Sequence, residues 1–232
     1  MTRASGPADS FVESVAAGIA HEVRNPLNAL QINLRILEQE IGHVLPDRGA
    51  HAYEVLRSIA SELSQLDHFV SEFLRYARPP QLRLERLGLR DLLADLGTFV
   101  GPECARKQVH LKIDVASGLP ALLADGFQLK HALLNLVLNS LRATPEEGTI
   151  TITAVAGSAA VQVSVHDTGE GIDAERLTRV FELFFTTREG GTGLGLPIAR
   201  RIVEAHGGTL ELNSAVGAGT TATISLPLPS EA

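Results

Sequence analysis

Aromatic and sulfur-containing residues are scarce in this sequence. Its 232 residues include one cysteine, one methionine, two tyrosines and no tryptophan. The single cysteine, Cys104, can form neither an intrachain disulfide nor a cysteine-rich zinc site. The chain also opens without the basic and apolar segments of a secretory signal peptide. These absences favour a protein of the reducing cytoplasm, where disulfides are rare.

Long apolar runs, excess positive charge and several enzyme motifs are missing as well. No stretch approaches the roughly 18 consecutive apolar residues of a membrane helix, so we expect no membrane segment. With 20 basic and 27 acidic residues the formal net charge is -7, which argues against nucleic acid as a partner. The patterns of P-loop and Rossmann nucleotide sites, serine hydrolases and zinc enzymes do not occur. The hydrophobic fraction of 44%, with 20% charged residues, is nevertheless sufficient for a packed core.

Apolar residues with helical spacing dominate the first third of the chain. Residues 1–10 are small and polar, and we interpret them as a tail or linker. Apolar positions then recur at steps of four and three over residues 16–44 and again over 56–77, before Pro79-Pro80. This pattern predicts an antiparallel helical hairpin over residues 11–79. Because a hairpin cannot bury its apolar seams alone, we expect a homodimer with a four-helix bundle; packing on the rest of the same chain is the alternative.

Residues 80–232 mix helical and strand periods. Alternating apolar and polar residues from Val109 to Val115 predict a half-buried strand. The other predicted elements are helices at 89–100, 126–144 and 194–206 and strands at 149–156, 160–167, 209–214 and 220–227. Helices and hairpins mixed in this way predict an α+β domain, a two-layer sandwich of one sheet with its helices on one face.

The first predicted helix carries a candidate nucleophile. His21, Glu22 and Asn25 fall on the outward side of the heptad seam. An exposed imidazole beside a carboxylate can be oriented through one ring nitrogen while the other acts as nucleophile or proton acceptor. Pro26 follows in the helix interior, where a proline costs roughly 3 kcal/mol and introduces a kink. A surface His–Glu pair on a bent helix is the alternative interpretation.

Three segments of the second domain carry residues suited to a nucleotide. Asn135 and Asn139, with Arg142 nearby, form a polar stripe on an apolar helix; amide oxygens suit Mg2+ and a guanidinium suits phosphate. Asp167 ends a predicted strand, where its carboxylate can accept a hydrogen bond from an exocyclic amine. Residues 187–196 contain four glycines just before a helix, an arrangement that can cradle phosphate. Solvated asparagines and plain glycine-rich turns are the alternatives.

Taken in order, these segments resemble the sequence boxes of a sensor histidine kinase of a two-component system. AHEVRNPLNAL at residues 20–30 resembles the H box, and NLVLN at 135–139 resembles the N box. DTGEGI at 167–172, VFELFFTT at 180–187 and GTGLGL at 191–196 resemble the G1, F and G2 boxes. The resemblance covers nearly the whole chain and implies the ATP-binding sandwich shared with gyrase B, Hsp90 and MutL.

The resemblance implies a role for each matched residue. His21 would be the phospho-acceptor and Glu22 its general base. Asn139 would hold Mg2+, and Asp167 would accept a hydrogen bond from the adenine amine. The segment from Thr186 to Gly195 would form a mobile lid over the triphosphate. The other residues that would contact ATP or its metal ion are Asn135, Arg142, Gly169, Gly171, Ile172, Phe185, Thr187, Arg188, Thr192, Gly193, Leu194, Leu196 and Thr220.

The implied activity is ATP-dependent autophosphorylation on His21, followed by phosphoryl transfer to an aspartate of a response regulator receiver domain. Asn25 stands where threonine is common in the family. In this family, an acidic residue followed three positions later by Thr or Asn is associated with dephosphorylation of the regulator. Glu22 and Asn25 fit that pattern, so we also expect a phosphatase activity.

Two other functions are compatible with the same sequence. One is a phosphotransfer or scaffold protein with an inactive nucleotide fold, against which the intact Asn139 and Asp167 argue. The other is an ATPase or serine kinase of the same nucleotide fold, against which the hairpin carrying His21 argues. The 232 residues suffice for both catalytic domains but not for a sensor. We therefore expect the input signal to come from an upstream sensor domain or a partner.

Overall fold

The computed structural model of the chain describes residues 30, 32–37, 39, 50–77, 81–187 and 191–228. These residues belong to two compact units, which divide at Pro79–Pro80.

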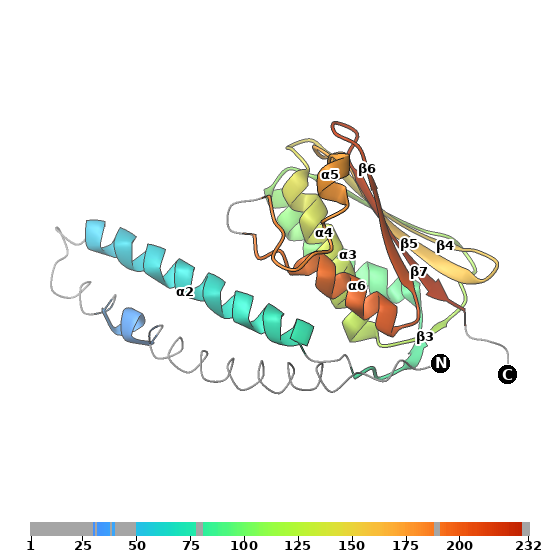
Figure 1. Ribbon diagram of the computed structural model, residues 1–232, viewed down its shortest axis with the longest axis horizontal. Coiled ribbons are helices and arrows are strands. Elements are labelled where there is room, and N and C mark those ends of the chain that lie inside the picture. Colours follow the sequence, from blue (N-terminus) through green and yellow to red (C-terminus); the bar gives the residue numbers. More distant parts are fainter. Residues whose placement is uncertain are drawn as a thin grey trace. The chain divides into compact units, whose positions relative to one another are not determined.

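The first unit is helical. Residues 32–37 form a helical segment, and helix α2 spans Ala50–Ala77 (Figure 1). Leu56, Val70 and Leu74 on α2 are buried, at separations of two heptads and four residues. The helical character predicted for residues 11–79 is confirmed for the part of that range that the structure describes. In the described part of the chain no helix has the length and apolarity needed to cross a bilayer.

The second unit has two layers, a five-stranded sheet and a layer of helices on one of its faces (Figure 1). The strand order is β2-β4-β5-β7-β6; β2 runs parallel to β4, and all other neighbours are antiparallel. The strands are β2 (His110–Val115), β4 (Thr149–Ala156), β5 (Ala160–Asp167), β6 (Thr209–Ser214) and β7 (Thr220–Pro227). The main helices are α3 (Leu89–Arg106), α4 (Gly126–Ala143) and α6 (Gly195–Ala205). The predicted α+β sandwich is confirmed.

Alternation along the strands creates the buried face of this sheet. Ile150 and Ile152 on β4, and Val163 and Val165 on β5, are at most 1% exposed, whereas the residues between them are more exposed. The helices cover this face with their own leucines and with Cys104 near the end of α3. Burial raises the pKa of the Cys104 thiol.

Three short elements and one helix end differ from the sequence prediction. Strands β1 (Glu85–Leu87) and β3 (Leu122–Ala124) form a separate antiparallel pair, and α5 (Ala174–Leu177) is a single turn. None of the three is long enough to show a period in the sequence. Helix α3 continues past the predicted end at Val100 to Arg106, with Pro102 on its exposed side.

Candidate functional site

Asp167 is a buried carboxylate at the end of a central strand. It closes β5, lies opposite Thr220 on β7 and is 2% exposed. Its Oδ1 accepts hydrogen bonds from the backbone N–H groups of Gly169 at 3.0 Å and Thr220 at 3.2 Å. Within the described residues no donor meets its Oδ2. One oxygen thus fixes the carboxylate in the fold, and the other can accept from a ligand.

The glycines after Asp167 allow the protein backbone to pack closely on itself. A Cβ on Gly169 would lie 2.7 Å from the carbonyl oxygen of Ala143, at the end of α4. A Cβ on Gly171 would lie 2.0 Å from the carbonyl oxygen of Ala215. The family resemblance assigns both glycines to contact with ATP. In the structure, the lack of a side chain at these positions lets the loop pack closely against α4 and the β6–β7 turn.

A hydroxyl group that the sequence analysis missed joins Ile172 to Thr220. The backbone N–H of Ile172 donates to Ser214 Oγ at 2.8 Å. Ser214 Oγ donates to the Gly219 carbonyl at 2.8 Å and lies 2.8 Å from Thr220 Oγ1. Since a hydroxyl has one proton, the Thr220 hydroxyl donates to Ser214. Ser214 therefore fixes the loop that follows Asp167 against β6 and β7.

The asparagines of α4 face the start of α6. A Cβ on Gly195, the first residue of α6, would lie 3.4 Å from Asn135 Oδ1 and 3.7 Å from Asn139 Nδ2. Asn135 Nδ2 is buried, and no described group accepts from it. Buried polar groups are normally hydrogen-bonded, so this donor is suited to a ligand oxygen such as that of a phosphate. Arg142 lies in the last turn of α4 and is exposed.

Helix α4 is fixed at its start by Asp125. Asp125 Oδ1 accepts from the Gln128 N–H and Oδ2 from the Arg83 N–H, both at 3.0 Å. Its own N–H donates to His206 Nε2 at 3.0 Å, at the end of α6. Burial alone raises the pKa of this carboxyl, but the backbone donors Arg83, Gln128 and Phe127 and the nearby His206 outweigh it. The pKa of Asp125 therefore lies below its ordinary value.

The glycine-rich segment is anchored on the F-box segment. Phe184 N–H donates to the Gly193 carbonyl at 3.2 Å, and both residues have φ of 64°. A Cβ on Gly193 would lie 2.5 Å from the carbonyl carbon of Phe184, so only glycine fits there. Leu194 is fully buried and precedes α6. Gly193 and Leu194, which lead into α6, are thus held against packed structure.

Two arginines and several of the predicted residues lie in or next to the F-box and glycine-rich segments. Arg179 lies over the ring of Phe185, 4.3 Å from its centroid, and Arg200 of α6 lies 5.0 Å from the ring centroid of Phe181. Thr192 Oγ1 accepts from the Leu194 N–H at 3.4 Å. Thr186 and Thr187 are exposed, and Leu196 is half-buried in the first turn of α6. The two arginines were not singled out from the sequence, because the aromatic partners lie on another element or loop.

The structure brings most predicted nucleotide residues of the second unit to adjacent loops and helix ends. Asn135, Asn139 and Gly195 lie together, and Asp167, Gly169 and Thr220 lie together. Ala143, at the end of α4, connects the two groups through its contact with Gly169. His21, Glu22, Asn25 and Arg188 lie outside the described residues, so their roles stay predictions.

Comparisons with known proteins place the chain in a family. Residues 12–81 match the family model described as "His Kinase A (phospho-acceptor) domain", and residues 124–230 match "Histidine kinase-, DNA gyrase B-, and HSP90-like ATPase". Sensor histidine kinase ZraS of Escherichia coli (strain K12) is 36% identical over 214 residues, 92% of this chain and 45% of ZraS. Sporulation kinase C of Bacillus subtilis (strain 168) is 32% identical over 223 residues, 96% of this chain and 50% of that kinase. The chain spans about half the length of the curated relatives it matches.

Solved structures give the same assignment. Full-length ShkA in complex with AMPPNP matches with a TM-score of 0.80 and 29% identity, over 94% of this chain and 46% of ShkA. Histidine kinase ThkA in complex with the response regulator protein TrrA matches with a TM-score of 0.69 and 27% identity, over 95% of this chain and 63% of that one. The two domain matches, the relatives and the folds agree, and the chain belongs to the sensor histidine kinases of two-component systems, of which it contains the catalytic core.

Proposed function

We propose that this chain phosphorylates His21 with the γ-phosphate of ATP and then transfers the phosphoryl group to an aspartate of a response regulator receiver domain. The observation that carries the proposal is the buried Asp167 carboxylate. Two backbone N–H groups hold one of its oxygens at the strand end where the resemblance assigns adenine recognition. The relatives, which are named as a sensor histidine kinase and a sporulation kinase, support the same activity.

The described residues suit a nucleoside triphosphate. Asp167 accepts a hydrogen bond from the adenine amine, which is a donor and therefore matches a carboxylate. Asn135 Nδ2, buried and without an acceptor in the described structure, donates to a phosphate oxygen. The first turn of α6 leaves N–H groups without intrahelical partners, and its positive dipole end favours phosphate.

The residues present also fit a magnesium ion. Asn139 lies one turn after Asn135 on α4, and amide oxygens are hard ligands of the kind that Mg2+ accepts. When bound, Mg2+ neutralises charge on the phosphate oxygens. Asn139 would hold the ion, and Glu22 would take the proton of the His21 imidazole as that ring attacks phosphorus. In the reaction the new N–P bond forms as the bond to the ADP oxygen breaks, and ADP leaves.

Apolar side chains on the first unit support a homodimer. Leu30 and Leu37 are exposed and seven residues apart, as are Ile59 and Leu66 on α2. A second set, which includes Leu56 and Val70 on α2, is buried within the unit. Exposed apolar residues at heptad spacing are typical of a helix seam that packs on a second copy. The proposed dimer therefore buries the exposed stripe in a four-helix bundle.

The test of the kinase activity is incubation of the chain with γ-labelled ATP and Mg2+. We expect label that is lost in acid and retained in alkali, as a phosphohistidine requires, and no label in His21→Gln. Glu22→Gln should label slowly, because its amide cannot take the proton. Acid-stable label would instead indicate a serine or threonine kinase, and ATP hydrolysis without label an ATPase. Absence of nucleotide binding would indicate a scaffold.

We further propose that the chain dephosphorylates its regulator, with Glu22 and Asn25 orienting the attacking water. The measurement is the half-life of a phosphorylated receiver domain with and without the chain and ADP. In the presence of Asn25→Ala, the half-life should be as long as that of the receiver domain alone. The variant should nevertheless still phosphorylate its own His21. A half-life in Asn25→Ala equal to that of the unchanged chain would contradict the role of Asn25.

A further inference from the structure

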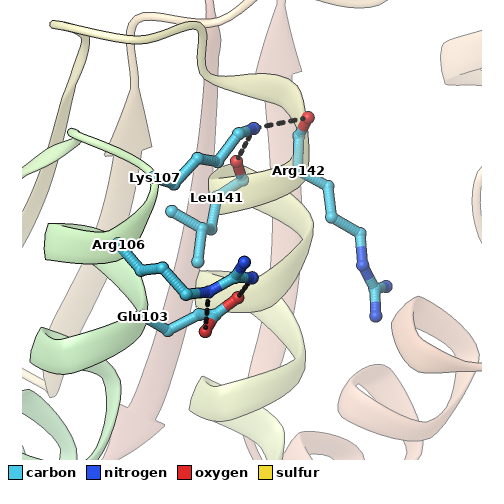
Figure 2. Close-up of polar contacts among 5 residues, drawn as sticks. All are labelled: Glu103, Arg106, Lys107, Leu141 and Arg142. Carbon is cyan, nitrogen blue, oxygen red and sulfur yellow. Dashed lines mark hydrogen bonds and ion pairs between the residues drawn. The ribbon is translucent and has the colours of Figure 1, made fainter.

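The ammonium group of Lys107 lies against the C-terminal turn of α4. Lys107 follows α3, yet its Nζ donates to the carbonyl oxygens of Leu141 at 2.6 Å, Arg142 at 3.3 Å and Thr144 at 2.9 Å. Figure 2 shows the first two of these bonds. The last carbonyls of a helix have no intrahelical partners, and a cation is favourable at that end. An ammonium group has three donors, so Lys107 is fully engaged with a helix that lies more than 30 residues away in sequence.

The remaining carbonyl of this turn contacts the loop after Asp167. Glu170 N–H donates to the Ala143 carbonyl at 3.4 Å, and Gly169 packs against the same oxygen. Lys107 therefore holds the turn through the carbonyls of the residues on both sides of Ala143. A shift of this turn would move the Ala143 carbonyl against Gly169, whose N–H fixes Asp167 Oδ1.

The same turn carries Arg142. In Figure 2 the Arg142 side chain extends away from Lys107, while its carbonyl oxygen points toward the ammonium group. Asn139 and Asn135 lie one and two turns earlier on α4. The Lys107 ammonium group bonds backbone carbonyls of this turn, not the side chains that are assigned to the nucleotide. It fixes the backbone from which those side chains project.

The neighbouring cation does not share this role. Arg106 pairs with Glu103 on the exposed surface of α3, in two hydrogen bonds that Figure 2 also shows. The hydrogen bonds from Arg106 lower the pKa of the Glu103 carboxyl. Arg106 is thus a matched control: it is a cation next to Lys107, and its side-chain hydrogen bonds in the described structure go to Glu103 rather than to α4.

The geometry points to Lys107 as a positioning residue for nucleotide binding: its ammonium group holds the C-terminal turn of α4 in register with the Asp167 loop. The inference rests on the proposed function, because it concerns the ATP site of the kinase. A merely structural role would reduce the fraction of folded protein, which lowers kcat and leaves the dissociation constant of the folded fraction unchanged. A positioning role changes the affinity of the folded protein for nucleotide.

The test uses the full 232-residue chain and AMPPNP as the probe, with affinity measured by calorimetry and active-site concentration fitted. We expect Lys107→Met to raise the AMPPNP dissociation constant and the KM for ATP by about tenfold, a typical coupling between two sites. The kcat at saturating ATP should change less than threefold, and Arg106→Met should bind as the unchanged chain does. In Lys107→Ala, methylammonium should lower the dissociation constant by replacing the missing group.

A second readout needs no nucleotide. Hydrogen exchange of the Glu170 amide should quicken in Lys107→Met and not in Arg106→Met. Should Lys107→Met fail to fold, Lys107→Ala serves for the same comparison, because it also removes the ammonium group. An unchanged dissociation constant in a folded variant, or equal effects in the Arg106 control, overturns the inference alone. If the wild-type chain itself binds no AMPPNP, the proposed function is overturned, and this inference falls with it.

Discussion

At the scale of single residues, Asp167 combines a structural and a binding role in one carboxylate. Asp167→Asn keeps an oxygen that can accept from Gly169 and Thr220, so we expect the fold to persist. The substitution removes the charge and replaces the second acceptor with a donor. Since a hydrogen bond to a charged group contributes about 1.5–3 kcal/mol, ADP affinity should fall roughly ten- to a hundredfold. Calorimetry with ADP measures this, and near-unchanged affinity would contradict adenine recognition by Asp167.

A second residue-scale prediction compares two glycines in the turn between β6 and β7. Gly219 has φ of 79°, and a Cβ there would lie 1.9 Å from the Asp167 carbonyl oxygen. Gly217 has φ of 77°, but a Cβ there would meet nothing within 4 Å. Gly217→Ala should therefore cost only about 1–2 kcal/mol of left-handed strain. Gly219→Ala adds a backbone clash and should cost about 3 kcal/mol or more.

Urea unfolding followed by circular dichroism checks the difference between the two alanine variants. Equal losses of unfolding free energy would show that the turn relaxes around the added methyl group of Gly219→Ala.

At the scale of elements, Asp125 determines how α4 begins. We expect Asp125→Ala to lower the free energy of unfolding by about 1–2 kcal/mol at pH 7, as the loss of a helix N-cap does. Asp125→Asn should lose less, because its single amide oxygen can still accept from Gln128 or Arg83. The measurement is urea unfolding of both variants against the unchanged chain.

The stability lost in Asp125→Ala should depend on pH. The pKa of Asp125 is lower in the folded chain than its ordinary value, so its ionisation stabilises the fold above that ordinary value. This contribution is lost as the pH falls below about 4 and through the lowered folded value. The stability gap between the unchanged chain and Asp125→Ala should therefore narrow on acidification. A gap that stays constant from pH 7 to pH 3.5 would contradict this assignment.

Elements with a long hydrophobic period could be predicted from sequence, and short or long-range features could not. Strands β4 and β5 alternate over eight residues each, and their predicted bounds agree with the structure. Strands β1 and β3 have three residues each, too few for an alternation to stand out. In the site, Asp167 could be found because it ends a strand and precedes glycines. Ser214 and Lys107 could not, because their contacts depend on how distant elements pack.

At the scale of the whole molecule, the exposed stripe on the first unit determines the oligomeric state that we propose. Leu66→Glu places a carboxylate in that stripe, and each dimer would bury two of them. Each uncompensated buried charge costs several kcal/mol, so the dissociation constant should rise at least about a hundredfold. Ser61→Glu, on an exposed position of the same helix about half a turn away from the stripe, is the matched control.

Light scattering after size-exclusion chromatography distinguishes the two states. We expect a dimer for the unchanged chain and for Ser61→Glu, and a monomer for Leu66→Glu at micromolar concentration. A monomeric unchanged chain, or a dimeric Leu66→Glu chain, would contradict packing through this stripe.

The burial of Cys104 makes the chain a convenient host for site-specific labels. A buried thiol with a raised pKa forms little thiolate at neutral pH, so maleimide reagents react with it slowly. A cysteine introduced on an exposed position would then be the fast-reacting thiol of the chain, without removal of the native one. Paired fluorophores or spin labels, one in each compact unit, could report on the distance between the units as nucleotide binds and leaves.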